Sequence, residues 1–97
     1  SRQDDNVKQK IKSQLTVERK EINYRKKKKI KNRITWIDRR FIQLEKLIQE
    51  NQEVLKNPAN KSDFDLLQRS LEKINFLETE YITLIEEKEN IVKLDII

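Results

Sequence analysis

A run of positive charge in the first third of the chain is the feature best suited to bind another molecule. Residues 24–33 read YRKKKKIKNR, with seven bases and no acid. On a helix, four consecutive lysines cover every side, so they can hold phosphates at several contacts without reading a base sequence. The residues that we expect to contact a partner or nucleic acid are Arg25, Lys26, Lys27, Lys28, Lys29, Lys31, Arg33, Trp36 and Arg40.

The charge is divided unequally along the chain. Residues 1–40 contain 15 Lys and Arg against 5 acids, whereas residues 41–97 contain 7 against 12, and the whole chain carries +5. A clustered basic region indicates an acidic partner, of which nucleic acid is the commonest. The acidic half could instead complement the basic half within the fold, each exposed pair contributing at most about 1 kcal/mol. Both interpretations stay open at this point.

Trp36 is the only tryptophan and lies off the predicted helix seam. Arg33 and Arg40 are three residues before it and four after it, which places them on the same side of a helix. Such a stripe can anchor a protein interface or stack on a base. It can also simply cover the flank of a hairpin, with the arginine stems lying over apolar surface.

Catalytic residues are largely missing. The chain has no histidine, cysteine or glycine, which removes imidazole bases, thiolate nucleophiles, zinc sites of the usual kind and glycine-rich phosphate loops. Carboxylate pairs such as Glu78 and Glu80 are ordinary on a charged helix. We therefore expect a protein that is not an enzyme, with no catalytic or metal site, no cofactor and no small-molecule ligand.

Periodic apolar residues predict the elements that carry these side chains. From Ile30 to Leu55 they recur in steps of 4, 3, 4, 3, 4 and 7, the heptad rhythm of a helix that buries one seam. We predict one helix from about Asp5 to Lys56, since Pro58 disfavours its continuation. Ser62 or Asp63 then caps a second helix over about 64–94.

The predicted fold is all-α: an antiparallel, coiled-coil-like helical hairpin with one very long N-terminal helix, a turn at 57–62 and a shorter second helix. Short connections make neighbouring helices antiparallel. Residues 25–97 form the hairpin, and residues 1–24 form a basic helical arm that needs a partner. The arm has a thin apolar stripe at Val7, Ile11, Leu15 and Ile22. A three-helix bundle with a break near Asn23 or Asn32 is the alternative fold.

The second helix carries two apolar stripes. We expect the broader one to face the first helix, with Phe41 opposite Glu78 and Ile34 opposite Ile85; it comprises Phe64, Leu67, Leu71, Ile74, Tyr81, Ile85 and Val92. The neighbouring stripe is then left for another chain, because a lone hairpin would leave it in water. It comprises Leu66, Leu77, Leu84 and Ile91.

These features predict a protein–protein interaction or assembly module that packs helices against a protein partner or against itself. Nucleic-acid binding through the basic helix is the alternative, and a homodimeric four-helix bundle would use the same apolar surfaces. We expect no membrane partner, because no apolar run approaches the ~20 residues that span a bilayer. Absence of cysteine, and of any signal-peptide-like stretch, predicts an intracellular protein, cytoplasmic or nuclear.

Overall fold

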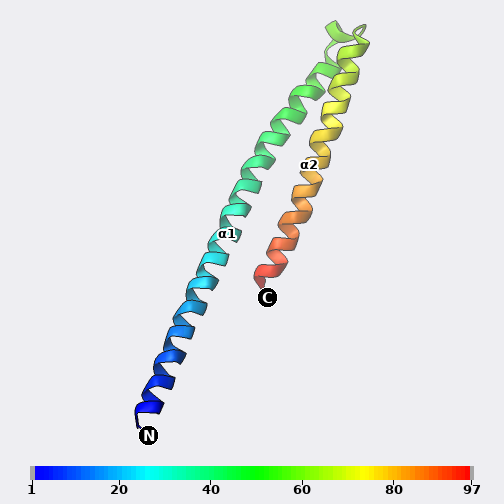
Figure 1. Cartoon of the computed structure of the whole chain (residues 1–97). Coiled ribbons are helices and arrows are strands. Elements are labelled where there is room, and N and C mark those ends of the chain that lie inside the picture. Colours follow the sequence, from blue (N-terminus) through cyan, green and yellow to red (C-terminus); the bar gives the residue numbers. More distant parts are fainter. Residues whose placement is uncertain (1, 97) are drawn as a thin grey trace. The chain divides into compact units, whose positions relative to one another are not determined.

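The computed structural model describes the backbone of residues 2–96 and the side chains of residues 8–94. It contains α1 (Arg2–Lys56), a short 3-10 turn η1 (Pro58–Asn60) and α2 (Phe64–Ile96), as Figure 1 shows. No strand occurs among these residues. The predicted all-α helical hairpin is confirmed. α1 is continuous through Asn23 and Asn32, so the alternative three-helix bundle is not formed.

The chain divides into two compact units, Ser1–Arg33 and Ile34–Ile97, which are described separately. The first unit is a single helix, part of α1, on which every described side chain from residue 8 to residue 29 is exposed. Ile11, Leu15 and Ile22 are therefore all in water. The side chain of Val7, which the sequence places in the same stripe, lies outside the described residues.

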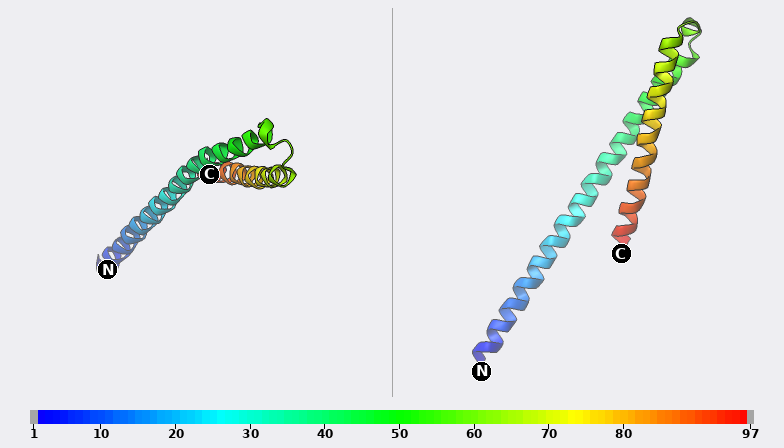
Figure 2. Two further views of the ribbon diagram at one scale, coloured as in Figure 1. Left: turned by 90° about the horizontal axis from the view of Figure 1, so that it is seen from above. Right: turned by 45° about the vertical axis from the view of Figure 1, so that its right-hand side comes forward.

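The second unit is the hairpin formed by the remainder of α1 and by α2. Both views in Figure 2 show α2 running back beside this part of α1. Two cross-helix contacts establish the antiparallel direction. Asp38 pairs with Lys88 and, seven residues further along α1, Glu45 pairs with Tyr81, seven residues earlier in α2.

The connection between the helices is built from local hydrogen bonds. Pro58 has no N–H group to donate to a helix, and α1 ends at Lys56, as predicted. The Asn57 side-chain oxygen accepts a hydrogen bond from the backbone N–H of Ala59 at 3.0 Å. Asp63 then caps α2 by accepting from the Leu66 N–H at 3.1 Å. This bond satisfies one of the backbone donors that a helix start leaves unpaired.

A narrow apolar core holds the two helices of the hairpin together. Ile37 and Leu44 of α1 are fully buried, and Leu77 and Leu84 of α2 complete the buried cluster. Five partly buried side chains pack around it: Phe41, Leu47, Ile48, Tyr81 and Ile91. The α1 half of this core follows the heptad stripe expected from the sequence.

The predicted partner of Phe41 is wrong by three residues. Phe41 packs on Tyr81, with ring centroids 4.7 Å apart, and not opposite Glu78. Phe64, expected in the seam, is exposed at the start of α2. Three residues of helix correspond to a shift of about 4.5 Å and a rotation of about 60°.

The rotation changes which residues of the two α2 stripes are buried, although Ile74 of the predicted seam is buried and Tyr81 packs against the core, as expected. Leu84, assigned to an outer surface, is 5% exposed, whereas Ile85, assigned to the seam, is 37% exposed. The predicted seam would have enclosed the Glu78 carboxylate, which is costly without a partner. The observed seam includes Lys88 as a charged residue, where the predicted seam had Glu78. The long stem of Lys88 lets the ammonium reach Asp38 at 2.6 Å, and it lies 5.9 Å from the centre of the Phe41 ring.

Candidate partner-binding surfaces

An apolar row lies on one side of α2 in the hairpin unit. It consists of Leu71, Ile82, Ile85 and Val92, which fall within a narrow sector of the helix at 100° per residue and are all exposed. We call it the Ile82 flank. Three of its members were expected in the seam, and Ile82 was assigned to neither stripe. An apolar row of this kind on a helix surface is typical of a protein-binding site.

Two shallow grooves run beside the Ile82 flank. One, of about 320 Å³, is floored by Ile48, Tyr81 and Ile82 and carries the carboxylates of Glu45 and Glu78 with no base in its lining. The other, of about 440 Å³, has three apolar side chains and three charged ones; it is lined by Phe41, Ile85, Lys88, Glu89, Val92 and Lys93. The first groove is therefore bordered by two acids, and the second by two bases and one acid.

Side-chain contacts between the helices fix the floor of these grooves. The Tyr81 hydroxyl donates to Oε1 of Glu45 at 2.8 Å, which raises the pKa of Tyr81 because ionisation would place two negative groups together; burial acts in the same direction. The Lys88–Asp38 pair lies on the same side. A partner would meet a surface that is already ordered, which lowers the entropy cost of binding.

The opposite side of the hairpin has a different character. A groove of about 690 Å³ has two acids and two bases and includes Phe76, which is 74% exposed; its lining is Leu47, Glu50, Asn51, Val54, Arg69, Glu72, Lys73, Phe76 and Leu77. Within this lining, Phe76 is the most exposed apolar side chain. The lining of this groove is therefore balanced in charge, unlike the groove that contains Glu45 and Glu78.

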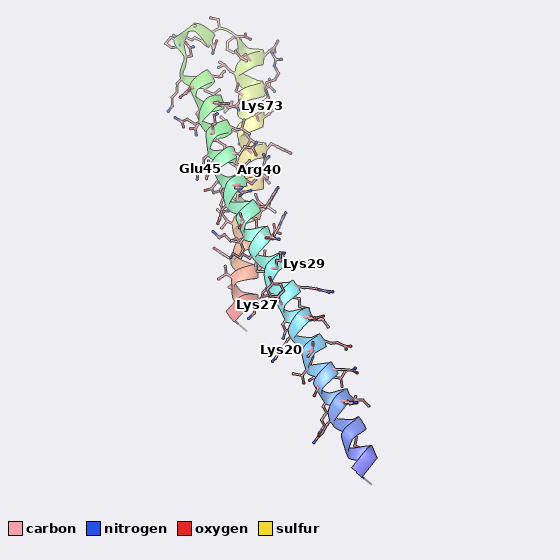
Figure 3. The ribbon with its side chains drawn as sticks, turned by 90° about the vertical axis from the view of Figure 1, so that its left-hand side faces the viewer. Lys20, Lys27, Lys29, Arg40, Glu45 and Lys73 are labelled. Atoms are coloured by element: carbon pink, nitrogen blue, oxygen red, sulfur yellow. The ribbon has the colours of Figure 1, made fainter. Side chains whose placement is uncertain are left out.

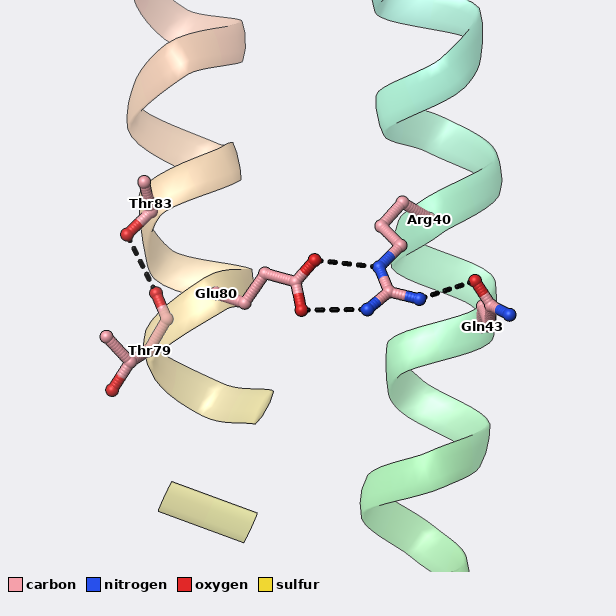
Figure 4. Close-up of polar contacts among 5 residues, drawn as sticks. All are labelled: Arg40, Gln43, Thr79, Glu80 and Thr83. Atoms are coloured by element: carbon pink, nitrogen blue, oxygen red, sulfur yellow. Dashed lines mark hydrogen bonds and ion pairs between the residues drawn. The ribbon is translucent and has the colours of Figure 1, made fainter. Parts of the chain in front are cut away.

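Arg40, expected to contact an external partner, is engaged within the hairpin. Its Nε and Nη2 donate to the two carboxylate oxygens of Glu80 at 2.8 and 2.9 Å, and its Nη1 donates to Gln43 at 2.6 Å (Figure 4). This two-pronged geometry is the strong form of an arginine–carboxylate pair. The hydrogen bond from Arg40 lowers the pKa of Glu80, and partial burial opposes it. An external role for Arg40 would require this pair to open.

The Arg40–Glu80 pair predicts a pH dependence of stability. The pKa of Glu80 lies below its ordinary value of 4.5 in the folded state, so the pair stabilises the hairpin above that value and loses its effect as pH falls through the lowered pKa. Glu80→Gln should therefore destabilise the hairpin at neutral pH and approach wild type in acid. Urea unfolding between pH 3 and 7 measures this. In an Arg40→Gln background the same substitution should have no such effect; an unchanged pH dependence would contradict the assignment.

The predicted basic cluster lies mainly on the first unit. Residues 25–29 are all exposed, and within the described part of that unit no ion pair or hydrogen bond holds their side chains. Lys20, Lys27 and Lys29 are labelled along this helix in Figure 3. Lys31 and Arg33 are exposed as well. A helix with this charge distribution can approach an acidic surface from several sides.

Trp36 belongs to the hairpin unit and is 47% exposed. It lines a groove of about 650 Å³ together with Arg39, Arg40, Lys46 and Glu80. Its indole is therefore accessible to another molecule, as the sequence interpretation requires. Whether it binds one stays a prediction.

The leucine stripe assigned to a protein interface needs correction. Leu77 and Leu84 are core residues, and Ile91 packs against that core, because α2 turns this stripe towards α1. Leu66 is half-buried near the start of α2. The exposed apolar side chains on this helix include those of the Ile82 flank. The sequence did contain a signal for which stripe faces α1, namely the polar residues that each stripe would bring into the seam. One stripe contains Glu78, and the other contains Ser70 and Lys88.

The described residues contain neither a metal-binding cluster nor a membrane-spanning stretch. No group of three or more Asp, Glu, His or Cys side chains there is placed to hold a metal ion. None of the described helices has a stretch both long enough and apolar enough to span a bilayer.

Comparisons with known proteins add no relationship. No protein-family model matches the chain, and neither a curated protein nor a solved structure shows significant similarity to it.

Proposed function

We propose that the chain is a non-enzymatic protein–protein interaction or assembly module, in which a helix of the partner packs along the Ile82 flank. The observation that carries the proposal is the row of exposed apolar side chains on an ordered helix pair. Burying an aliphatic side chain completely stabilises a complex by about 1.5–3 kcal/mol. Four half-exposed side chains in one row can therefore supply substantial affinity, and their spacing suits a docked helix.

Nucleic-acid binding is the second candidate, and the exposed lysines of residues 26–29 are the observation that favours it. Four phosphate contacts would make binding fall by about a hundredfold for a fourfold rise in salt. The Ile82 flank would be irrelevant to such binding. The two functions therefore depend on different residues in different units.

Site-specific photo-cross-linking tests the proposed function. Benzoylphenylalanine is placed at Ile82, which is 57% exposed, and at Phe76 as the matched control on the other side of the hairpin. In the protein's own cells, position 82 should give a defined protein adduct that position 76 does not give. The cross-linked species should be lost when Val92→Lys is added.

A different pair of results would favour nucleic-acid binding over the proposed function. If position 82 cross-links to no protein, and the chain binds duplex DNA or RNA with steep salt dependence that is abolished by reversing residues 26–29 to glutamate, the nucleic-acid function replaces the proposed one.

A further inference from the structure

The two units of the chain carry opposite charge. Unit Ser1–Arg33 has 13 bases against 4 acids, and unit Ile34–Ile97 has 9 against 13. Each unit also exposes an apolar row: Ile11, Leu15 and Ile22 on the first, and the Ile82 flank on the second. The first unit therefore exposes an apolar row and has an excess of bases, whereas the second exposes an apolar row and has an excess of acids.

We propose that the occupant of the Ile82 flank is the basic helix, residues 8–31, of a second copy of this chain. This inference rests on the proposed function and names its partner. The basic helix of one copy lies along α2 of the next, which adds a third helix to the hairpin. If both copies donate and accept, the exchange closes into a dimer with two-fold symmetry.

The apolar residues of the two surfaces match in spacing. Ile11, Leu15 and Ile22 follow one another by 4 and 7 residues, and Ile82, Ile85 and Val92 by 3 and 7. At 1.5 Å per residue these rows extend over about 16.5 Å and about 15 Å. Laid parallel, the three side chains of one row meet the three of the other in order. Steps of three, four and seven are those that let two helices interdigitate.

Charge fixes this alignment. With Ile11 beside Ile82, Lys8 and Lys12 approach the groove that contains Glu45 and Glu78 and no base. Exposed pairs of this kind contribute at most about 1 kcal/mol each. They orient the helix and speed its approach, whereas the apolar contacts supply most of the affinity.

The same charges disfavour like-with-like association. Two basic helices would bring two strongly positive segments together, and two Ile82 flanks would bring Glu45 and Glu78 of one copy towards those of the other. Like charges placed opposite each other lower affinity. Contact between the unlike surfaces is the arrangement in which the apolar rows are buried and the charges attract.

Complementation between two variants of the full chain tests the proposal. The helix variant Leu15→Lys/Ile22→Lys loses the donated row, and the flank variant Ile82→Lys/Val92→Lys loses the accepting row. All four positions are exposed, and lysine is a good helix former, so both variants should fold; circular dichroism and Trp36 fluorescence verify this. Sedimentation velocity measures association.

Wild type should associate with increasing concentration and dissociate as salt rises. Each variant alone should lose association by about a hundredfold or more. An equimolar mixture should form a heterodimer, because the helix variant keeps an intact flank and the flank variant keeps an intact helix. Phe76→Lys is the control and should behave as wild type.

Two outcomes would overturn the inference. A wild type that is monomeric at its highest soluble concentration removes the second copy as the partner, while the cross-linking test of the proposed function is unaffected. Association of wild type without complementation in the mixture shows that identical surfaces pair instead. Should a variant fail to fold, benzoylphenylalanine at position 82 decides the question: the attached peptide must come from residues 8–31 of another copy, and any other peptide contradicts the proposal.

Discussion

Leu44→Ala is expected to destabilise the hairpin by about 2–5 kcal/mol, because it removes buried methyl groups and leaves a cavity that two helices cannot fully close. Leu44 is fully buried at the centre of the core. A small helical unit without disulfides is stabilised by only about 3–5 kcal/mol. Most of the cooperative unfolding transition should therefore disappear. Urea unfolding followed by the fluorescence of Trp36 reports on the hairpin alone, since no other tryptophan is present.

Ile42→Ala is the matched control for this experiment. Ile42 lies on the same helix two residues away but is exposed. Its truncation should change the free energy of unfolding by no more than about 0.5 kcal/mol. Equal losses in the two variants would mean that the core does not lie where the structure places it.

The α1 half of the fold could be predicted from the sequence because its signals agree. The heptad stripe, the absence of glycine and the single proline all indicate one long helix ending before Pro58, and α1 ends at Lys56. For α2 the signals compete. Two apolar stripes lie side by side on it, and periodicity alone cannot decide which faces inward.

The choice between the stripes depends on tertiary contacts. Lys88 can occupy the seam because Asp38 lies within reach and Phe41 lies beneath its stem. Glu78 has no such partner among the described side chains, so α2 turns it outward. The candidate site was missed for this reason: Leu71, Ile85 and Val92 were assigned to the seam that Leu77 and Leu84 occupy.

Contacts across the hairpin also explain why Arg40, a member of the predicted arginine stripe, is engaged within the fold. Arg40 pairs with Glu80 across the hairpin and with Gln43 along α1, which agrees with the alternative that acids of the second half pair with bases of the first within the fold. The sequence left open whether the basic run is exposed or paired within the fold; residues 25–29 are exposed, and their role in binding a partner stays a prediction.

The second large effect concerns two neighbouring residues with opposite expected roles. Leu84→Ala should cost about 2–5 kcal/mol, since Leu84 belongs to the buried cluster. Ile85→Ala should cost less than about 1 kcal/mol in the monomer, because Ile85 already contacts water and alanine favours the helix. The comparison must be made at a concentration and salt at which sedimentation shows a monomer, so that a partner copy does not contribute.

This pair of variants tests the central claim most directly: that the leucine stripe closes the hairpin and leaves the Ile82 flank for a partner. The measurement is the free energy of unfolding of Leu84→Ala and Ile85→Ala by urea, followed by Trp36 fluorescence. A large loss for Leu84→Ala with a small one for Ile85→Ala is the predicted result. A large loss for Ile85→Ala with a small one for Leu84→Ala would contradict it and return Ile85 to the seam.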